Sequence, residues 1–184
     1  MTLTPVRDNL IEGEEDITFS LSAPQSPSHD YTIGDPNEGA ATISDDVAEV
    51  ELTANDVAAD EAGQDPASFT VTRNGQGNPA VSLIVYLQIG GTASVDADYS
   101  AANMSNAGGG TFFLTIPAGA PSQSVVVTPT FDQTIEGNET VTFTLVAPQS
   151  PGHDYLVGMP SQAQITILDN VPAIVKDGFE NLMK

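Results

Sequence analysis

One segment of this chain occurs twice, and this repetition limits its possible folds more than any other feature. Residues 4–47 align with residues 128–171 without a gap, and 24 of the 44 aligned pairs are identical. The stretch APQSPSHDY, for example, returns as APQSPGHDY 124 positions later. A repeat of domain length indicates tandem modules. We therefore predict the back half of one module at 1–46, a complete module at 47–170 and a short tail at 171–184.

The complete module is predicted to consist of β-strands. Seven segments are rich in Val, Ile, Thr and Phe, and several alternate apolar with polar residues, as half-buried strands do. Gly, Pro, Asn and Asp clusters separate them, and no stretch has a sustained helical period. This pattern predicts an all-β fold, a seven-stranded antiparallel β-sandwich of the immunoglobulin or fibronectin-III type, with an incomplete second sandwich at the N-terminus. The predicted strands are 49–54, 68–73, 80–89, 111–116, 124–131, 140–147 and 164–168.

The charge of the chain excludes several classes of partner. Four basic residues face 25 acidic ones, for a net charge of −21. Nucleic acid and anionic membrane surfaces both require a basic footprint, so neither is an expected partner. No apolar run is long enough to insert into a bilayer, and the absence of cysteine excludes disulfides and thiolate sites. The carboxylates either keep the protein soluble through charge repulsion or bind a hard cation, and composition does not decide between these two interpretations.

Three longer motifs carry a family resemblance. EGNETVTFTLVAPQSPGHDYLVGMPSQAQITILDN at 136–170 resembles the end of a Calx-β domain, the module of sodium–calcium exchangers and of many bacterial surface proteins. GGTASVDADYS at 90–100 is similar to the family's G-T-A segment that ends in D-Y, and TIPAGAPSQSVVVTPTFD at 115–132 to its I-P-A-G turn. The resemblance covers 47–170 in full and 1–46 as a second half.

The resemblance implies a calcium site at one end of the sandwich. Ca²⁺ prefers six to eight oxygen ligands drawn from carboxylates and carbonyls on loops, and crowded carboxylates repel one another unless a cation lies among them. Two departures from the family pattern, a single Asp in TFDQTIEGNE and Asn170 in place of a second terminal Asp, predict one or two sites of modest affinity. Plain solvated strand-end carboxylates are the alternative. The implied ligands are Glu61, Asp98, Asp132, Glu136, Glu139 and Asp169.

The N-terminal half module carries the matching acidic residues without their partners from a front half. We therefore expect weak calcium binding there. The junction ISDDVAEVEL is too short to cross the sandwich and place this half in the complete module, so 1–46 is predicted to be partly ordered at best. His29 and His153 are interpreted as hydrogen-bonding residues of turns. The matching acidic residues are Asp8, Glu12, Glu15, Asp45 and Asp46.

The functional hypothesis is a non-enzymatic, calcium-binding structural or adhesion module of a secreted or cell-surface bacterial protein. Calcium would rigidify the end that joins neighbouring repeats, and the expected partners are those repeats or other cell-surface proteins. No signal peptide is recognised in this chain. Two alternatives remain. One is a metal-independent adhesive or spacer sandwich that binds protein or glycan, and the other is a non-catalytic module of a larger hydrolase.

Overall fold

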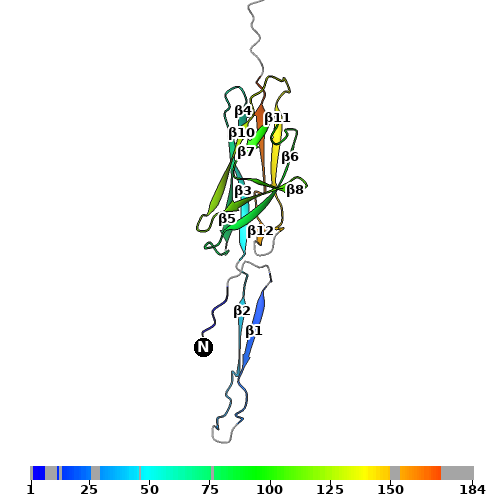
Figure 1. Cartoon of the computed structure of the whole chain (residues 1–184). Helices are drawn as coiled ribbons and strands as arrows, with labels where there is room; N and C mark the ends of the chain where they lie inside the picture. Colours follow the sequence, from blue (N-terminus) through cyan, green and yellow to red (C-terminus); the bar gives the residue numbers. More distant parts are fainter. Residues whose placement is uncertain are drawn as a thin grey trace, which may run out of the picture.

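The computed structural model consists of a two-stranded ribbon followed by a β-sandwich (Figure 1). The structure describes residues 2–6, 12, 14–25, 30–45, 47–75, 77–149 and 154–170. Some sequence predictions fall outside these residues, namely those for Asp8, His29, Asp46, His153 and the tail 171–184. No helix of membrane-spanning length and apolarity occurs in the described part of the chain.

Two sheets form the sandwich. The first has the strand order β12-β3-β5-β10-β7, and the second has the order β4-β13-β11-β6-β9-β8. The first sheet contains β3 (Ala48–Asp56), β5 (Ala67–Gly75), β7 (Tyr99–Ala101), β10 (Ser122–Pro129) and β12 (Tyr155–Val157). The second contains β4 (Ala58–Asp60), β6 (Leu83–Gly91), β8 (Ser105–Gly108), β9 (Thr111–Ile116), β11 (Glu139–Leu145) and β13 (Gln162–Leu168).

The core lies between the two sheets because each long strand buries alternate residues. In β3, Val50 and Leu52 are fully buried while Glu49 on the other face is exposed. The rings of Phe69 from one sheet and Phe143 from the other lie 4.4 Å apart between centroids, tilted by 37°. Such an aromatic contact adds to the apolar area that both rings remove from water. The predicted all-β sandwich is confirmed.

The structure adds four short strands, β4, β7, β8 and β12, that the sequence did not predict. Each has three or four residues, too few to show an alternating pattern. Two of their pairings are parallel, β12 with β3 and β13 with β4. The N-terminal segment of the sandwich makes both contacts because it passes from one sheet to the other after an irregularity between Ala54 and Asp56.

The half module forms a ribbon of β1 (Glu15–Ser20) and β2 (Glu38–Ile43). These strands pair antiparallel with each other as a separate two-stranded sheet. In Figure 1 the ribbon lies beyond the end of the sandwich that carries β12. The N-terminal half therefore has defined strand pairing but is not part of either sheet of the sandwich.

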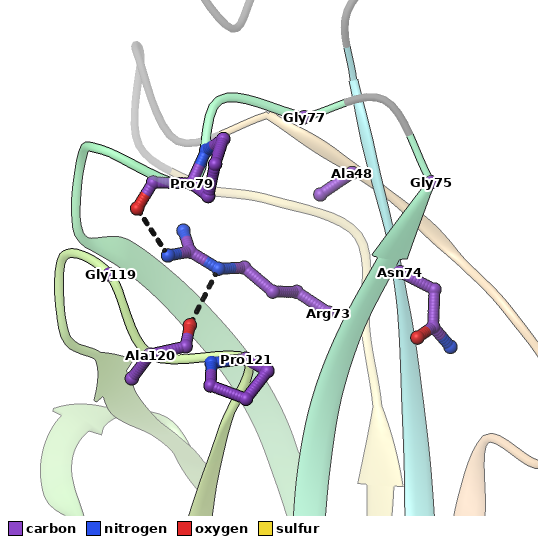
Figure 2. A pocket seen from close by; sticks show the side chains of 9 residues that line it. All are labelled: Ala48, Arg73, Asn74, Gly75, Gly77, Pro79, Gly119, Ala120 and Pro121. Atoms are coloured by element: carbon purple, nitrogen blue, oxygen red, sulfur yellow. Dashed lines mark hydrogen bonds between the residues drawn. The ribbon is translucent and has the colours of Figure 1, made fainter.

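A cavity of about 360 Å³ lies at this same end of the sandwich, where β3 begins. Arg73 points into it, and its guanidinium donates hydrogen bonds to the backbone carbonyls of Ala120, Val81, Pro79 and Pro117. Figure 2 shows two of these bonds, to Pro79 and Ala120. Because four of the five N–H groups bind carbonyls, Arg73 joins the surrounding turns and leaves little capacity for an anionic ligand.

Two buried tyrosines offer a matched test of hydrogen bonding in the core. The Tyr155 hydroxyl donates to the Val146 carbonyl at 2.6 Å and accepts from the Tyr86 N–H at 3.0 Å. The Tyr99 hydroxyl is buried without a hydrogen-bond partner among the described residues. Burial raises the pKa of both side chains to about 12, and for Tyr99 the neighbouring carboxylates Asp98 and Asp96 add to the effect.

We expect Tyr155→Phe to lower the free energy of unfolding by about 1–3 kcal/mol, because the buried Val146 carbonyl would lose its donor. Tyr99→Phe is expected to change stability by less than about 0.5 kcal/mol or to raise it, because it removes an unpaired hydroxyl. Urea unfolding of both variants beside the parent chain measures the difference. Equal losses in the two variants would contradict this assignment.

Candidate metal centre

Six carboxylates lie where strands begin or end at the pole of the sandwich opposite the Arg73 cavity. Glu61 follows β4, Asp98 precedes β7, Asp132 follows β10, and Asp169 follows β13. Glu136 lies before β11, and Glu139 is its first residue. Antiparallel and parallel pairings of these strands bring their ends to one pole, which appears at the top of Figure 1. We call Glu61, Asp98, Asp132, Glu136, Glu139 and Asp169 the acidic rim.

Three members of the acidic rim converge closely. Asp98, Glu136 and Glu139 each offer a carboxylate oxygen, and these three atoms lie within 4.8 Å of one another. Asp98 is held in place by its own loop, because its Oδ2 accepts the Ser94 N–H at 2.6 Å and its N–H donates to the Ser94 carbonyl at 3.0 Å. The loop backbone therefore fixes the orientation of the Asp98 carboxylate.

Backbone groups also orient the rest of the acidic rim. Asp169 Oδ2 accepts the N–H groups of Glu136 at 3.1 Å and Gly137 at 2.8 Å, which fastens the loop before β11 to the end of β13. Asp132 Oδ1 accepts the Thr134 N–H at 2.7 Å. Asp132 and Asp169 lie outside the group of three, but they anchor the loop that carries Glu136.

Two carboxylate oxygens of the acidic rim are buried without a hydrogen-bond donor in the described part of the chain. They are Glu139 Oε2 and Asp169 Oδ1. Glu61 is also buried, with only 4% of its surface exposed, and the Asn170 N–H approaches its Oε2 at 3.5 Å. Buried polar atoms are normally paired, and an unpaired charged oxygen is costly. A hard cation would satisfy such oxygens, so the donor set fits calcium.

The pKa values of the acidic rim respond to this crowding. Burial raises the pKa of Glu139 above 4.5, and the charges of Asp98 and Glu136 raise it further. Burial is the main cause that raises the pKa of Glu61; the Asn170 N–H opposes it, and the charges of Asp169, Asp132 and Glu136 each add a smaller increase. For Glu136 burial is again the first cause, followed by Asp132 and Asp98. Each member of the rim thus acts electrostatically on at least one other member.

Sequence reasoning missed the residues that position the carboxylates. Ser94 provides the N–H that fixes Asp98, and the Thr92 hydroxyl accepts the Thr140 N–H at 2.9 Å beside Glu139. The Asn170 side chain donates to the Asp132 carbonyl and so joins the ends of β10 and β13. The spacing of the G-T-A motif at 91–93 does not show which backbone groups these residues contact.

Comparison with known proteins identifies the family. The Calx-beta domain family model matches residues 1–47 and residues 44–171. The chain belongs to the Calx-beta domain family. This is a family of non-catalytic binding domains. A search of curated proteins found no match.

Several solved structures are similar to this Calx-beta chain. The apo form of the Calx CBD1 domain is 20% identical, over 66% of this chain and 98% of that chain, with a TM-score of 0.46. The calcium binding domain CBD12 of CALX1.1 is 22% identical, over 64% of this chain and 44% of that chain, with a TM-score of 0.45. The adhesin InvE of Yersinia pseudotuberculosis is 16% identical, over 89% of this chain and 51% of that chain, with a TM-score of 0.33.

The half repeat contains part of the same arrangement. Both carboxylate oxygens of Asp45 accept the Glu12 N–H at 3.2 Å, which matches the bond from Glu136 to Asp169 in the complete repeat. Glu61 and Asp98 belong to the front half of a repeat, whereas residues 4–47 align with the back half. The ribbon therefore carries only the back part of an acidic rim.

Proposed function

We propose that the acidic rim binds calcium and that the protein acts as a non-enzymatic structural module. The observation that carries this proposal is a pair of buried oxygens, on Glu139 and Asp169, that have no hydrogen-bond donor among the described residues and lie beside the converging group of Asp98, Glu136 and Glu139. Those three carboxylates would hold the ion, with Glu61, Asp132 and Asp169 adding charge and orienting the loops. When bound, the ion would neutralise mutual repulsion among them.

The module's role would be mechanical, because the acidic rim lies where one repeat passes into the next. In the half repeat, Asp45 is the counterpart of Asp169, and β3 of the following repeat begins at Ala48. An ion that orders the rim loops would therefore also stiffen the joint between repeats. We extend the proposal to a secreted or cell-surface protein of several repeats, in which neighbouring repeats or other surface proteins are the partners.

Calorimetric titration with CaCl₂ tests the proposal, using the full chain after chelation. We expect saturable binding to the parent chain and an affinity at least about tenfold weaker in Glu139→Gln, because ligand charge sets the strength of calcium sites. Glu15→Gln is the matched control. Glu15 occupies the same position in the half repeat and is exposed, so its replacement should leave the titration unchanged.

The titration also separates this proposal from the metal-independent alternative. Absence of saturable heat at millimolar calcium in the parent chain would overturn the calcium site and favour a passive adhesive or spacer sandwich. An equal loss of affinity in Glu139→Gln and Glu15→Gln would place the binding elsewhere on the acidic surface.

A further inference from the structure

The sequence contains a single Asn-Gly step, Asn74–Gly75, and it lies at the end of β5. Both residues are exposed and line the Arg73 cavity. Figure 2 shows the Asn74 side chain on the side of β5 that faces away from the Arg73 guanidinium. Within the described part of the chain, no hydrogen bond holds the Asn74 side-chain amide, so its carbonyl carbon is accessible to a nucleophile.

The strand pairing directs the Gly75 N–H away from β3. The Gly158 N–H donates to the Val50 carbonyl at 2.8 Å, so the backbone groups of Val50 face β12 rather than β5. These directions alternate along a strand, so Glu49 exchanges its backbone hydrogen bonds with Asn74. The Gly75 N–H points opposite to the Asn74 carbonyl in the same planar peptide unit. Outside the strand ladders, no described residue accepts a hydrogen bond from this N–H.

This arrangement places a nucleophile beside the Asn74 amide. When the Gly75 N–H loses its proton to solvent, its nitrogen can bond to Cγ of Asn74, and the side-chain amide nitrogen leaves as ammonia. Water then opens the resulting succinimide at either carbonyl and gives aspartate or isoaspartate, so the net reaction exchanges ammonia for water. Gly75 has no Cβ that would crowd the attack. Asn74 must leave its strand conformation for the ring to close, and strand ends open locally.

A carboxylate at position 74 would meet a like charge. Glu49 lies directly opposite in the ladder, and like charges in such cross-strand pairs are destabilising. Glu49 has no room to turn toward Gly158, because a Cβ added there would lie 2.7 Å from the Glu49 Cγ and Oε1. Isoaspartate would also lengthen the main chain before Gly77, where an added Cβ would lie 2.6 Å from the Ala48 Cβ. Both products would therefore disturb the contact between β5 and the start of β3.

We propose that Asn74–Gly75 is a site of spontaneous deamidation in the folded protein, and that its product loosens the pairing of β3 with β5. Water is the only co-reactant. The site is separate from the acidic rim, which lies at the opposite pole of the sandwich. Because the modified fraction increases with time, this end of the sandwich would weaken as the protein ages.

The test incubates the full chain at mildly alkaline pH and measures released ammonia and modified peptides, the latter by mass spectrometry with an isoaspartate-specific methyltransferase as the probe. We expect modification at Asn74 to exceed modification at Asn106, an exposed asparagine in β8 that is followed by Ala107. Asn74→Gln should abolish most of the ammonia release, because its longer side chain cannot form the same ring.

A second measurement tests the effect of the product on the fold. Asn74→Asp should lower the urea midpoint of unfolding, and this shift should be smaller when Glu49 is replaced by glutamine, since the two positions are in contact. Asn106→Asp is the control for an added charge elsewhere on the surface, and we expect it to shift the midpoint less than Asn74→Asp does.

Two results would overturn the proposal. One is modification of Asn74 in the urea-unfolded chain but not in the folded chain, which would mean that the end of β5 holds the Gly75 N–H or the Asn74 backbone in place. The other is an equal midpoint shift for Asn74→Asp with and without Glu49→Gln, which would contradict the like-charge contact across the ladder.

Discussion

Replacing Gly91 with alanine is expected to lower the free energy of unfolding by about 3 kcal/mol or more. Gly91 ends β6 with a φ of +116°, a conformation that residues with a Cβ rarely adopt. A Cβ built at this position would lie 2.1 Å from the Thr140 carbonyl oxygen and 2.8 Å from its carbon. Because both atoms belong to the backbone of the paired strand, the clash can be relieved only by moving β11 away from β6.

The same substitution is expected to weaken calcium binding. The Thr140 carbonyl accepts the N–H groups of Thr92 at 2.9 Å and Ala93 at 3.1 Å, which start the loop to Asp98. Displacement of this carbonyl would move Asp98 relative to Glu139. Gly90→Ala is the control, because no atom lies within 4 Å of its Cβ position. Urea unfolding measures both variants, and a loss in Gly91→Ala no larger than in Gly90→Ala would contradict the close approach of these strands.

Removing calcium is expected to lower the stability of the protein at pH 7 and to reverse its pH dependence. Binding to the folded state alone contributes RT ln(1 + [Ca]/Kd), about 2.7 kcal/mol at a hundredfold excess over Kd. In the chelated protein the pKa values of Glu61, Glu136 and Glu139 are raised above 4.5 by burial and mutual repulsion. Their folded forms bind protons more readily than the unfolded chain, so stability should rise as the pH falls from 7 toward 5.

Calcium changes the sign of this dependence because it binds the ionised carboxylates. Calcium-saturated protein should therefore melt at a higher temperature at pH 7 than at pH 5. Chelated protein should melt at a lower temperature at pH 7 than at pH 5. Thermal melts at both pH values, with calcium or with EGTA, provide the measurement. In the chelated protein, Glu139→Gln should reduce the pH dependence of the melting temperature more than Glu15→Gln does. The Glu15→Gln variant controls for the general repulsion within a chain that has a net charge of −21. Identical melting curves with and without calcium would refute the stabilisation.

The long strands were predictable because their signal is local. Val50 and Leu52 alternate with polar residues in β3, and Val141, Phe143 and Leu145 do so in β11. The short strands β4 and β12 were missed because three residues carry no period. Their parallel pairing depends on where the N-terminal segment passes between the sheets, and sequence spacing does not contain that information.

The candidate site was predictable in part. The positions of the six carboxylates followed from the family motifs, and the structure brings Asp98, Glu136 and Glu139 within 4.8 Å of one another. Their assignment as calcium ligands stays a prediction. The roles of Ser94 and Asn170 in orienting the rim were not visible, because each acts through a hydrogen bond to or from a backbone group on a loop.

The sequence alone determined the repeat, the two-sheet architecture and the approximate positions of the long strands, since these depend on alternation and on motifs a few residues long. Only the tertiary structure decided how residues in similar local sequence differ in burial and hydrogen bonding. Glu15 and Glu139 both begin a strand shortly after E-G, yet the first is exposed and the second has a buried oxygen with no hydrogen-bond partner in the described part of the chain. Tyr99 and Tyr155 both follow Asp, yet within the residues that the structure describes the Tyr99 hydroxyl has no hydrogen-bond partner and the Tyr155 hydroxyl has two. The physical reason is that burial and electrostatic environment are produced by groups distant along the chain, here the front half that covers one hairpin and not the other.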